Sequence, residues 1–176
     1  MDLKEFKNLI DLFFYQAGKQ NPQSAFLEWL NPKNKIKFTW DETSLNIYKL
    51  AKTLKTNITD GDRCLLVSEN RPEWLISDIA IMLANGITVP AYITYTEKDY
   101  KYLIEDCQPS VIIVSNKEIH DKLKNIIDES PFIRKVITFE KIEKVNNKNK
   151  YLDFDSITKN NLQESDKIKN SSIKRN

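Results

Sequence analysis

Residues 63–91 read RCLLVSENRPEWLISDIAIMLANGITVPA, and this stretch predicts one strand–helix–strand unit. Arg63 to Ser68 is a short apolar run, typical of a strand buried on both faces. Pro72 suits the first turn of the following helix, because the missing N–H has no helical partner there in any case. Asn85-Gly86 is a stop signal, and Ile87 to Pro90 predicts a second strand. A helix between two such strands indicates that the strands are parallel.

The same alternation continues towards the carboxyl end of the chain. Ser110 to Val114 and Ile133 to Phe139 are the next predicted strands. Two capping signals predict the starts of the intervening helices: Thr96 with Asp99, and Ser115 with Glu118. Repeated strand–helix units of this length favour a parallel sheet. The predicted fold class is therefore α/β, with αβα layers around a mostly parallel sheet and helices on both of its faces.

The residues before this core predict a helix, a hairpin and a further helix. Lys4 to Gly18 is amphipathic, and Gly18 can end it. Ser24 to Leu30 and Ile36 to Trp40 predict hairpin strands that flank a Pro-containing turn. Thr39-Trp40-Asp41-Glu42 has the form of a capping box and begins the next helix. Asn57 is expected to end that helix in the left-handed conformation.

These elements divide the chain into four predicted segments. Residues 1–60 hold the N-terminal helix, the hairpin and the first capped helix, and residues 61–140 form the parallel αβα core. Residues 141–162 form a peripheral segment that docks through Phe154. Residues 163–176 have almost no hydrophobic side chains and are expected to form a flexible tail.

The composition excludes several classes of function. The 27 Lys and Arg nearly balance the 25 Asp and Glu, so a formal charge of +2 gives no field that would attract nucleic acid. Two cysteines without a Cys-x-x-Cys pair, and the single histidine His120, are too few ligands for a structural zinc site. Leu75 to Ala91 is the most apolar stretch, but polar residues interrupt it, so no transmembrane segment is expected. An acidic N-terminus is unlike a secretory signal, and a cytoplasmic location is expected.

No motif places a catalytic, cofactor-binding or metal-binding residue in the chain. Its three glycines stand apart, whereas a loop that wraps phosphate in backbone N–H groups needs several together. His120 is predicted to be solvated, because no nucleophile is placed near it. Glu105 and Asp106 are adjacent and would point apart on a helix, which disfavours a paired acid–base role. The tryptophans are predicted to pack in the core or at an interface: Trp29, Trp40 and Trp74.

Four short motifs together resemble the adenylate-forming, or AMP-binding, enzymes. They are Thr39 to Glu42, Gly61-Asp62-Arg63, Glu69-Asn70-Arg71-Pro72-Glu73-Trp74, and Asn85 to Tyr92. The resemblance covers roughly Phe6 to Leu123, and the Asn-Arg-Pro-Glu-Trp motif at residues 70–74 is most similar to that of the long-chain fatty acid–CoA ligases. Each motif also has a purely structural interpretation as a turn, a helix start or a strand end.

The resemblance implies a two-step acyl-CoA synthetase reaction with ATP, magnesium and coenzyme A acting on a fatty acid. It also implies a phosphate loop rich in Ser, Thr and Gly, which would be expected after Asn176. The 176 residues alone are therefore expected to be inactive and to bind none of these cofactors. Two alternatives stay open, a standalone non-catalytic binding module of similar fold and one chain of a split two-chain ligase. If the chain is part of a larger domain, Phe26, Trp29 and Phe38 are expected to be left uncovered and to promote association, whereas a well-behaved monomer would favour the standalone module.

Overall fold

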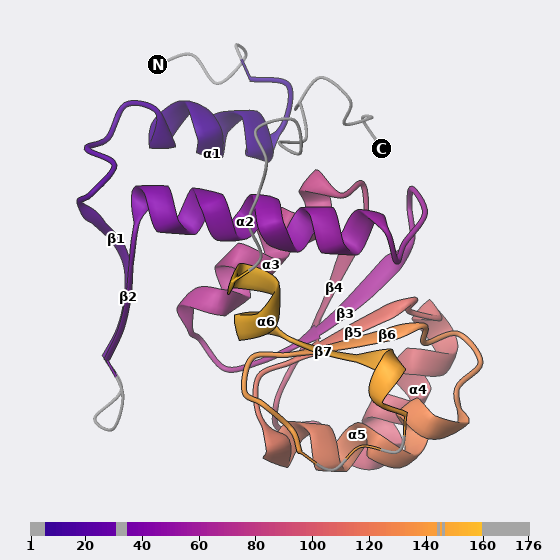
Figure 1. The fold of residues 1–176 in the computed structure, drawn as a ribbon. Helices are drawn as coiled ribbons and strands as arrows, with labels where there is room; N and C mark the ends of the chain where they lie inside the picture. The colour runs from indigo at the N-terminus through magenta and orange to yellow at the C-terminus, as the bar shows by residue number, and fades with distance from the viewer. Residues whose placement is uncertain (1–5, 31–34, 144, 146, 160–176) are drawn as a thin grey trace.

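Figure 1 shows a five-stranded sheet enclosed by helices and preceded by a helix and a two-stranded hairpin. The computed structural model describes residues 6–30, 35–143, 145 and 147–159. The strand order is β4-β3-β5-β6-β7, and every neighbouring pair is parallel. The strands are β3 (Arg63–Val67), β4 (Ile87–Ala91), β5 (Val111–Val114), β6 (Lys135–Thr138) and β7 (Tyr151–Asp153). The predicted α/β class is confirmed, and β7 is a fifth strand that the sequence pattern did not predict.

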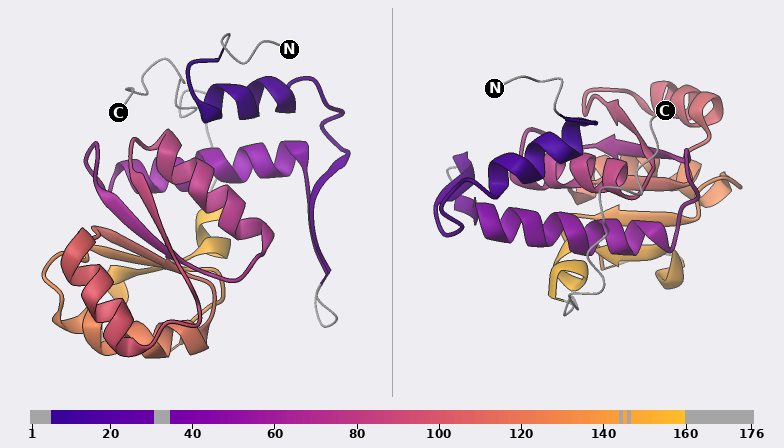
Figure 2. Two further views of the ribbon diagram at one scale, coloured as in Figure 1. Left: turned by 180° about the vertical axis from the view of Figure 1, so that it is seen from behind. Right: turned by 90° about the horizontal axis from the view of Figure 1, so that it is seen from above.

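Helices cover both faces of the sheet, as the continuously apolar strands predicted (Figure 2). One face carries α2 (Trp40–Lys55), α3 (Pro72–Leu83) and α6 (Phe154–Lys159), with α1 (Leu9–Ala17) packed on α2 and α3. The other face carries α4 (Glu97–Cys107) and α5 (Lys117–Glu129). We refer to the two buried clusters as the first core, which contains Leu66, and the second core, which contains Leu65.

Two of the three capping signals are confirmed. The Thr39 N–H donates to Glu42 Oε2 at 2.8 Å, and the Glu42 N–H donates to Thr39 Oγ1 at 3.1 Å. Thr96 and Asp99 form the same reciprocal pair at the start of α4. The predicted pair of Ser115 with Glu118 is wrong, because the cap of α5 is the next residue, Asn116, whose Oδ1 accepts from the Ile119 N–H at 3.0 Å. The Ser115 hydroxyl instead donates to Glu69, beyond the neighbouring strand.

The predicted left-handed end of α2 at Asn57 is also wrong. The helix ends at Lys55, and the Asn57 side chain donates to the Thr53 carbonyl at 2.7 Å. Among the described non-glycine residues, only Asn85 and Gln108 have positive φ, at 64° and 46°. The left-handed residue Asn85 therefore follows the end of α3, as predicted. The same prediction failed at Asn57, because the hydrogen bond from its side chain to the Thr53 carbonyl satisfies Asn57 without a reversal of the backbone.

The hairpin forms, and its aromatic side chains are half-buried rather than uncovered. Strand β1 (Ala25–Leu30) pairs antiparallel with β2 (Lys35–Thr39), and the turn between them lies outside the described residues. Phe26 stacks on Trp40 with ring centroids 3.7 Å apart, and Phe38 packs against the first core. Trp29 lies under the guanidinium of Arg71. The expectation that Phe26, Trp29 and Phe38 stay uncovered is thus wrong, because the neighbouring α2 and the chain after β3 supply partners from within the same 176 residues.

The end of the described chain docks as predicted. A short 3-10 helix, η2 (Lys148–Lys150), leads into β7, and Phe154 and Ile157 of α6 are buried in the first core. Residues 163–176, expected to form a flexible tail, lie outside the described residues. Among the residues that are described, no helix combines the length and apolar composition needed to cross a membrane.

Candidate functional site at the carboxyl edge of the sheet

The chain order places a topological switch point between the carboxyl ends of β3 and β5. The connection from β3 to β4 passes through α3 on the first-core face, and the return to β5 passes through α4 on the other face. The helix that follows β3 is α3, and the helix that follows the neighbouring strand β5 is α5, which lies on the second-core face. These two helices therefore leave the sheet on opposite faces. Ligands of open α/β sheets bind outside the carboxyl ends of the strands at such a switch point.

A pocket of about 500 Å³ opens beside this point, between the ends of β3 and β4. Ser68, Glu69 and Asn70 line it from the chain after β3. The opposite wall is mostly apolar and consists of Trp74, Pro90, Ala91, Tyr92 and Ile93. The Tyr92 side chain is 72% exposed, so this wall offers free aromatic surface to a ligand or a further segment of protein.

A buried ion cluster around Arg71 holds the loop that forms the polar wall. The Arg71 side chain is 4% exposed. Its Nε and Nη2 donate to both carboxylate oxygens of Glu73, at 3.0 and 2.8 Å. Nη1 lies 3.3 Å from Glu140 Oε1 and 3.6 Å from Glu69 Oε1. Burial alone would lower the pKa of Arg71, but the hydrogen bonds and charges of these carboxylates raise it, so the guanidinium stays charged.

Two aromatic rings enclose the same guanidinium. Its central carbon lies 4.7 Å from the Trp29 ring centroid and 5.4 Å from that of Phe139. Both distances are within the range of cation–π attraction. Arg71 thereby joins the hairpin, the start of α3 and the end of β6 in one contact.

The end of β5 is tied to the same cluster through Ser115. This side chain is fully buried, and its hydroxyl donates to Glu69 Oε2. Glu69 therefore bridges Ser115 and Arg71 across the switch point. Because three carboxylates surround one guanidinium, Arg71 is not a free cation for a phosphate group. The arrangement can position the walls of a ligand pocket, and the Ser115 hydroxyl is fully buried against Glu69 rather than presented to a ligand.

Sequence reasoning missed this cluster because it interpreted residues 69–74 as turns and helix starts. One signal was available, since Glu69, Arg71 and Glu73 alternate in charge with a spacing of two. Glu140 carried no such signal, because 69 positions separate it from Arg71 in the chain.

The structure corrects the prediction for His120. This residue lies on α5 with 1% exposure and is not solvated. Its Nε2 lies 3.0 Å from the Tyr151 hydroxyl on β7, and its Nδ1 lies 3.4 Å from Asp121 Oδ1. Burial lowers the pKa of His120, and the hydrogen bond and charge of Asp121 only partly oppose this. The prediction failed because the edge strand β7, which carries Tyr151, was not itself predicted.

This burial gives an expected pH dependence of stability. The unfolded chain binds a proton at His120 near the ordinary value of 6.5, whereas the folded chain does so only at lower pH. The contribution of His120 to stability should therefore be constant above that value and fall as the pH drops below it. Urea unfolding at about pH 7.5 and about pH 5.5 would measure the effect. His120→Gln is the control, and an undiminished pH slope in that variant would contradict the assignment.

Other residues considered from sequence form no site. Glu105 and Asp106 are both exposed on α4. Trp74 packs against the first core, as predicted for the tryptophans. Cys64 is buried, which raises the pKa of its thiol to about 12, and Cys107 is half-buried. Within the described ranges, no group of three His, Cys, Asp or Glu side chains could hold a metal ion.

Comparison with known sequences identifies related proteins. The family described as AMP-binding enzyme matches residues 13–174. The mitochondrial acyl-coenzyme A synthetase ACSM5 of Homo sapiens is 32% identical over 104 residues, covering 57% of this chain and 18% of that protein. A long-chain-fatty-acid–CoA ligase of Bacillus subtilis (strain 168) is 34% identical over 98 residues, covering 53% of this chain and 18% of that protein. The matched region thus spans less than a fifth of either relative.

The same fold occurs in solved structures. The acetoacetyl-CoA synthetase from Streptomyces lividans superposes with a TM-score of 0.76 at 18% sequence identity. The superposition covers 89% of this chain and 25% of that one. A likeness at this identity shows the fold alone, but the family match extends over nearly the whole chain. The protein belongs to the AMP-binding enzyme family, as the motifs between residues 39 and 92 suggested.

Proposed function

We propose that this chain supplies the amino-terminal part of an ATP-dependent fatty acid–CoA ligase. The observation that carries the proposal is the match over residues 13–174 together with relatives named as acyl-CoA synthetases and long-chain-fatty-acid–CoA ligases. In that reaction a fatty carboxylate attacks the α-phosphate of Mg-ATP, which gives an acyl-adenylate and pyrophosphate. The thiol of coenzyme A then displaces AMP and forms the thioester.

In this proposal the carboxyl-edge site positions substrate rather than transforming it. Trp74, Tyr92 and Ile93 give the pocket an apolar wall, which suits an apolar acyl group. The Arg71 cluster keeps the opposite wall rigid, because its ion pairs and ring contacts join three separate parts of the chain. Catalytic groups for the phosphates and the magnesium ion would come from the rest of the enzyme.

The proposal includes inactivity of the 176 residues on their own. Adenylation needs hydrogen-bond donors arrayed around three phosphates and carboxylates that hold a magnesium ion. The three glycines are isolated, and Arg71 is already neutralised by carboxylates. Losing a single donor of this kind commonly costs about a hundredfold or more in rate.

Pyrophosphate exchange driven by a long-chain fatty acid tests this prediction. We expect no exchange by the 176-residue chain, and exchange when the same residues are joined to a polypeptide that carries the remaining family motifs. Exchange only after mixing two separate polypeptides would favour a split two-chain ligase. Pyrophosphate exchange by the 176-residue chain alone would overturn the proposal. No exchange by the joined protein would favour a non-catalytic module.

A further inference from the structure

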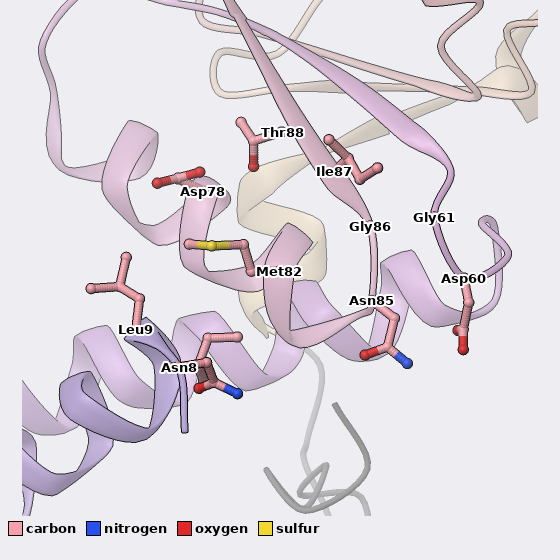
Figure 3. Close-up of a pocket in the computed structure, with 11 residues that line it drawn as sticks. Asn8, Leu9, Asp60, Gly61, Asp78, Met82, Asn85, Gly86, Ile87 and Thr88 are labelled. Carbon is pink, nitrogen blue, oxygen red and sulfur yellow. The ribbon is translucent and has the colours of Figure 1, made fainter. Parts of the chain in front are cut away.

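The two edges of the five-stranded sheet, β4 and β7, are built differently. A cavity of about 620 Å³ opens beside the start of β4, between Leu9 of α1 and Met82 of α3 (Figure 3). Asn85 lies at the far end of this cavity from Asp78, so its polar groups do not converge on a ligand. The edge at β7 is closed by the end of the described chain, through contacts that include a titratable side chain.

Residues 147–159, which we call the strap, form this edge. The strap comprises η2, β7 and α6. Its strand β7 is three residues long, and within the described part of the chain it pairs with β6 alone. Its helix α6 packs against α2, as Figure 1 shows, and buries Phe154 and Ile157 in the first core. One short ladder and two apolar anchors therefore hold most of the strap in place.

Two lysines add hydrogen bonds between the strap and the rest of the chain. Lys135 Nζ donates to the Asn149 carbonyl, and Lys150 Nζ donates to the Ile127 carbonyl, both at 2.7 Å. The first bond is exposed and the second is half-buried. Water can replace such partners when the strap moves, so each bond contributes only about 1 kcal/mol. These lysines therefore do not prevent a local opening.

His120 of α5 contacts the strap through the hydroxyl of Tyr151. Its Nε2 lies 3.0 Å from that hydroxyl, and the two rings meet edge to face with centroids 5.5 Å apart. Its Nδ1 lies 3.4 Å from the Asp121 carboxylate, which can only accept, so the neutral imidazole carries its proton on Nδ1. Nε2 therefore accepts the Tyr151 O–H. In this state each nitrogen of the ring has a partner.

A second proton on the His120 ring, at Nε2, would set two donors against each other. The Tyr151 hydroxyl would have to turn its proton away from Nε2 and lose its acceptor. It does not ionise instead, because burial raises the pKa of Tyr151 to about 12. The imidazolium would also lack water, since His120 is 1% exposed. Movement of the strap away from α5 solvates both groups.

The charges around His120 only partly favour the imidazolium. Asp121 and Asp128 on α5 favour it, whereas Lys124 on the same helix opposes it. The Asp121 carboxylate is shared with Lys117, whose hydrogen bond is the largest cause of the lowered pKa of Asp121. Burial outweighs these charges and lowers the pKa of His120. Beside Tyr151, on the strap and in the loop before it, cations outnumber carboxylates: Lys141, Glu143, Lys148, Lys150 and Asp153.

We propose that the strap is a pH-sensitive switch, which opens from α5 and β6 when His120 takes up a second ring proton. Opening uncovers the edge of β6 and the apolar side chains of Phe154 and Ile157. These two anchors keep the strap closed at neutral pH. Uptake of one proton raises the opening constant by at most about tenfold per pH unit. None of these residues lines the carboxyl-edge pocket, so the switch does not depend on the ligase proposal.

Amide hydrogen exchange of the 176-residue chain, followed by NMR between about pH 7.5 and about pH 5, tests the switch. Rates are corrected for the intrinsic pH dependence of exchange. We expect the amides of β7 and α6 to exchange through a local opening, faster than Ile112 and Ile113 of β5 and little accelerated by low urea. Below pH 6.5 the opening should become up to about tenfold more frequent per pH unit. Strap amides that exchange only together with those of β5, or whose protection does not change with pH, would overturn the proposal.

The imidazole and two variants give independent measurements. His120 is the single histidine, so its NMR titration is assigned directly, and the midpoint should lie below 6.5. His120→Gln should retain the protection of β5 and abolish the pH dependence of strap opening. Asp106→Asn, which removes an exposed carboxylate from α4, is the control and should leave that dependence unchanged. A pH dependence that persists in His120→Gln, or a midpoint at or above 6.5 in the unaltered chain, shows that the proposal is wrong.

Discussion

Replacing Arg71 with alanine is expected to lower the free energy of unfolding by about 3–5 kcal/mol. The variant would leave the buried Glu73 carboxylate without its two hydrogen bonds, and an unpaired buried charge is far more costly than an exposed one. It would also remove the cation between Trp29 and Phe139. Because a domain of this kind has a total stability of about 5–15 kcal/mol, the loss would be a large fraction of it. Urea unfolding measures the difference.

Two further variants separate the ion pair from general effects of substitution. Arg134→Ala breaks the pair with Asp62, but Arg134 is half exposed, so the cost should be no more than about 1 kcal/mol. The double variant Arg71→Met with Glu73→Met should recover much of the stability lost in Arg71→Ala, because neither charge is then left unpaired. Equal losses for Arg71→Ala and Arg134→Ala would contradict the role given to the cluster.

The sheet could be predicted from sequence because its signals are local. The apolar run at 63–68 requires cover on both faces, and the cap at Thr39 needs only Glu42, three residues away. Each such signal lies within one turn or one strand. The predictions failed where a partner came from elsewhere in the chain. The Ser115 hydroxyl donates to Glu69, for example, and Asn116 rather than Ser115 caps α5.

The candidate site was hidden from sequence for the same reason. Arg71 is defined by contacts to Trp29, Phe139 and Glu140, which are dozens of positions away in both directions. His120 likewise owes its burial to Tyr151, on a strand of three residues that is too short to produce a pattern. Long-range pairs of this kind leave no periodicity, so the topology could be derived while the pocket walls could not.

Adjacent leucines of β3 test the layered architecture directly. Leu65 and Leu66 are both fully buried, but alternate residues of a strand point to opposite faces. Leu65 packs in the second core, with α4 and α5, and Leu66 packs in the first, with α2 and α3. A sheet covered on one face only would bury one of them and expose the other.

Leu65→Ala and Leu66→Ala should therefore each lower the free energy of unfolding by about 2–5 kcal/mol, through lost apolar burial and the cavity left behind. Leu30→Ala is the matched control, because Leu30 is 77% exposed and the same change should cost no more than about 0.5 kcal/mol. Urea unfolding of the three variants at one pH gives the comparison. If either β3 variant behaved like Leu30→Ala, the face to which that side chain points would not be covered by helices, and the αβα arrangement would be wrong on that side. Losses of similar size at both positions require two cores of comparable packing, one on each face of a single strand.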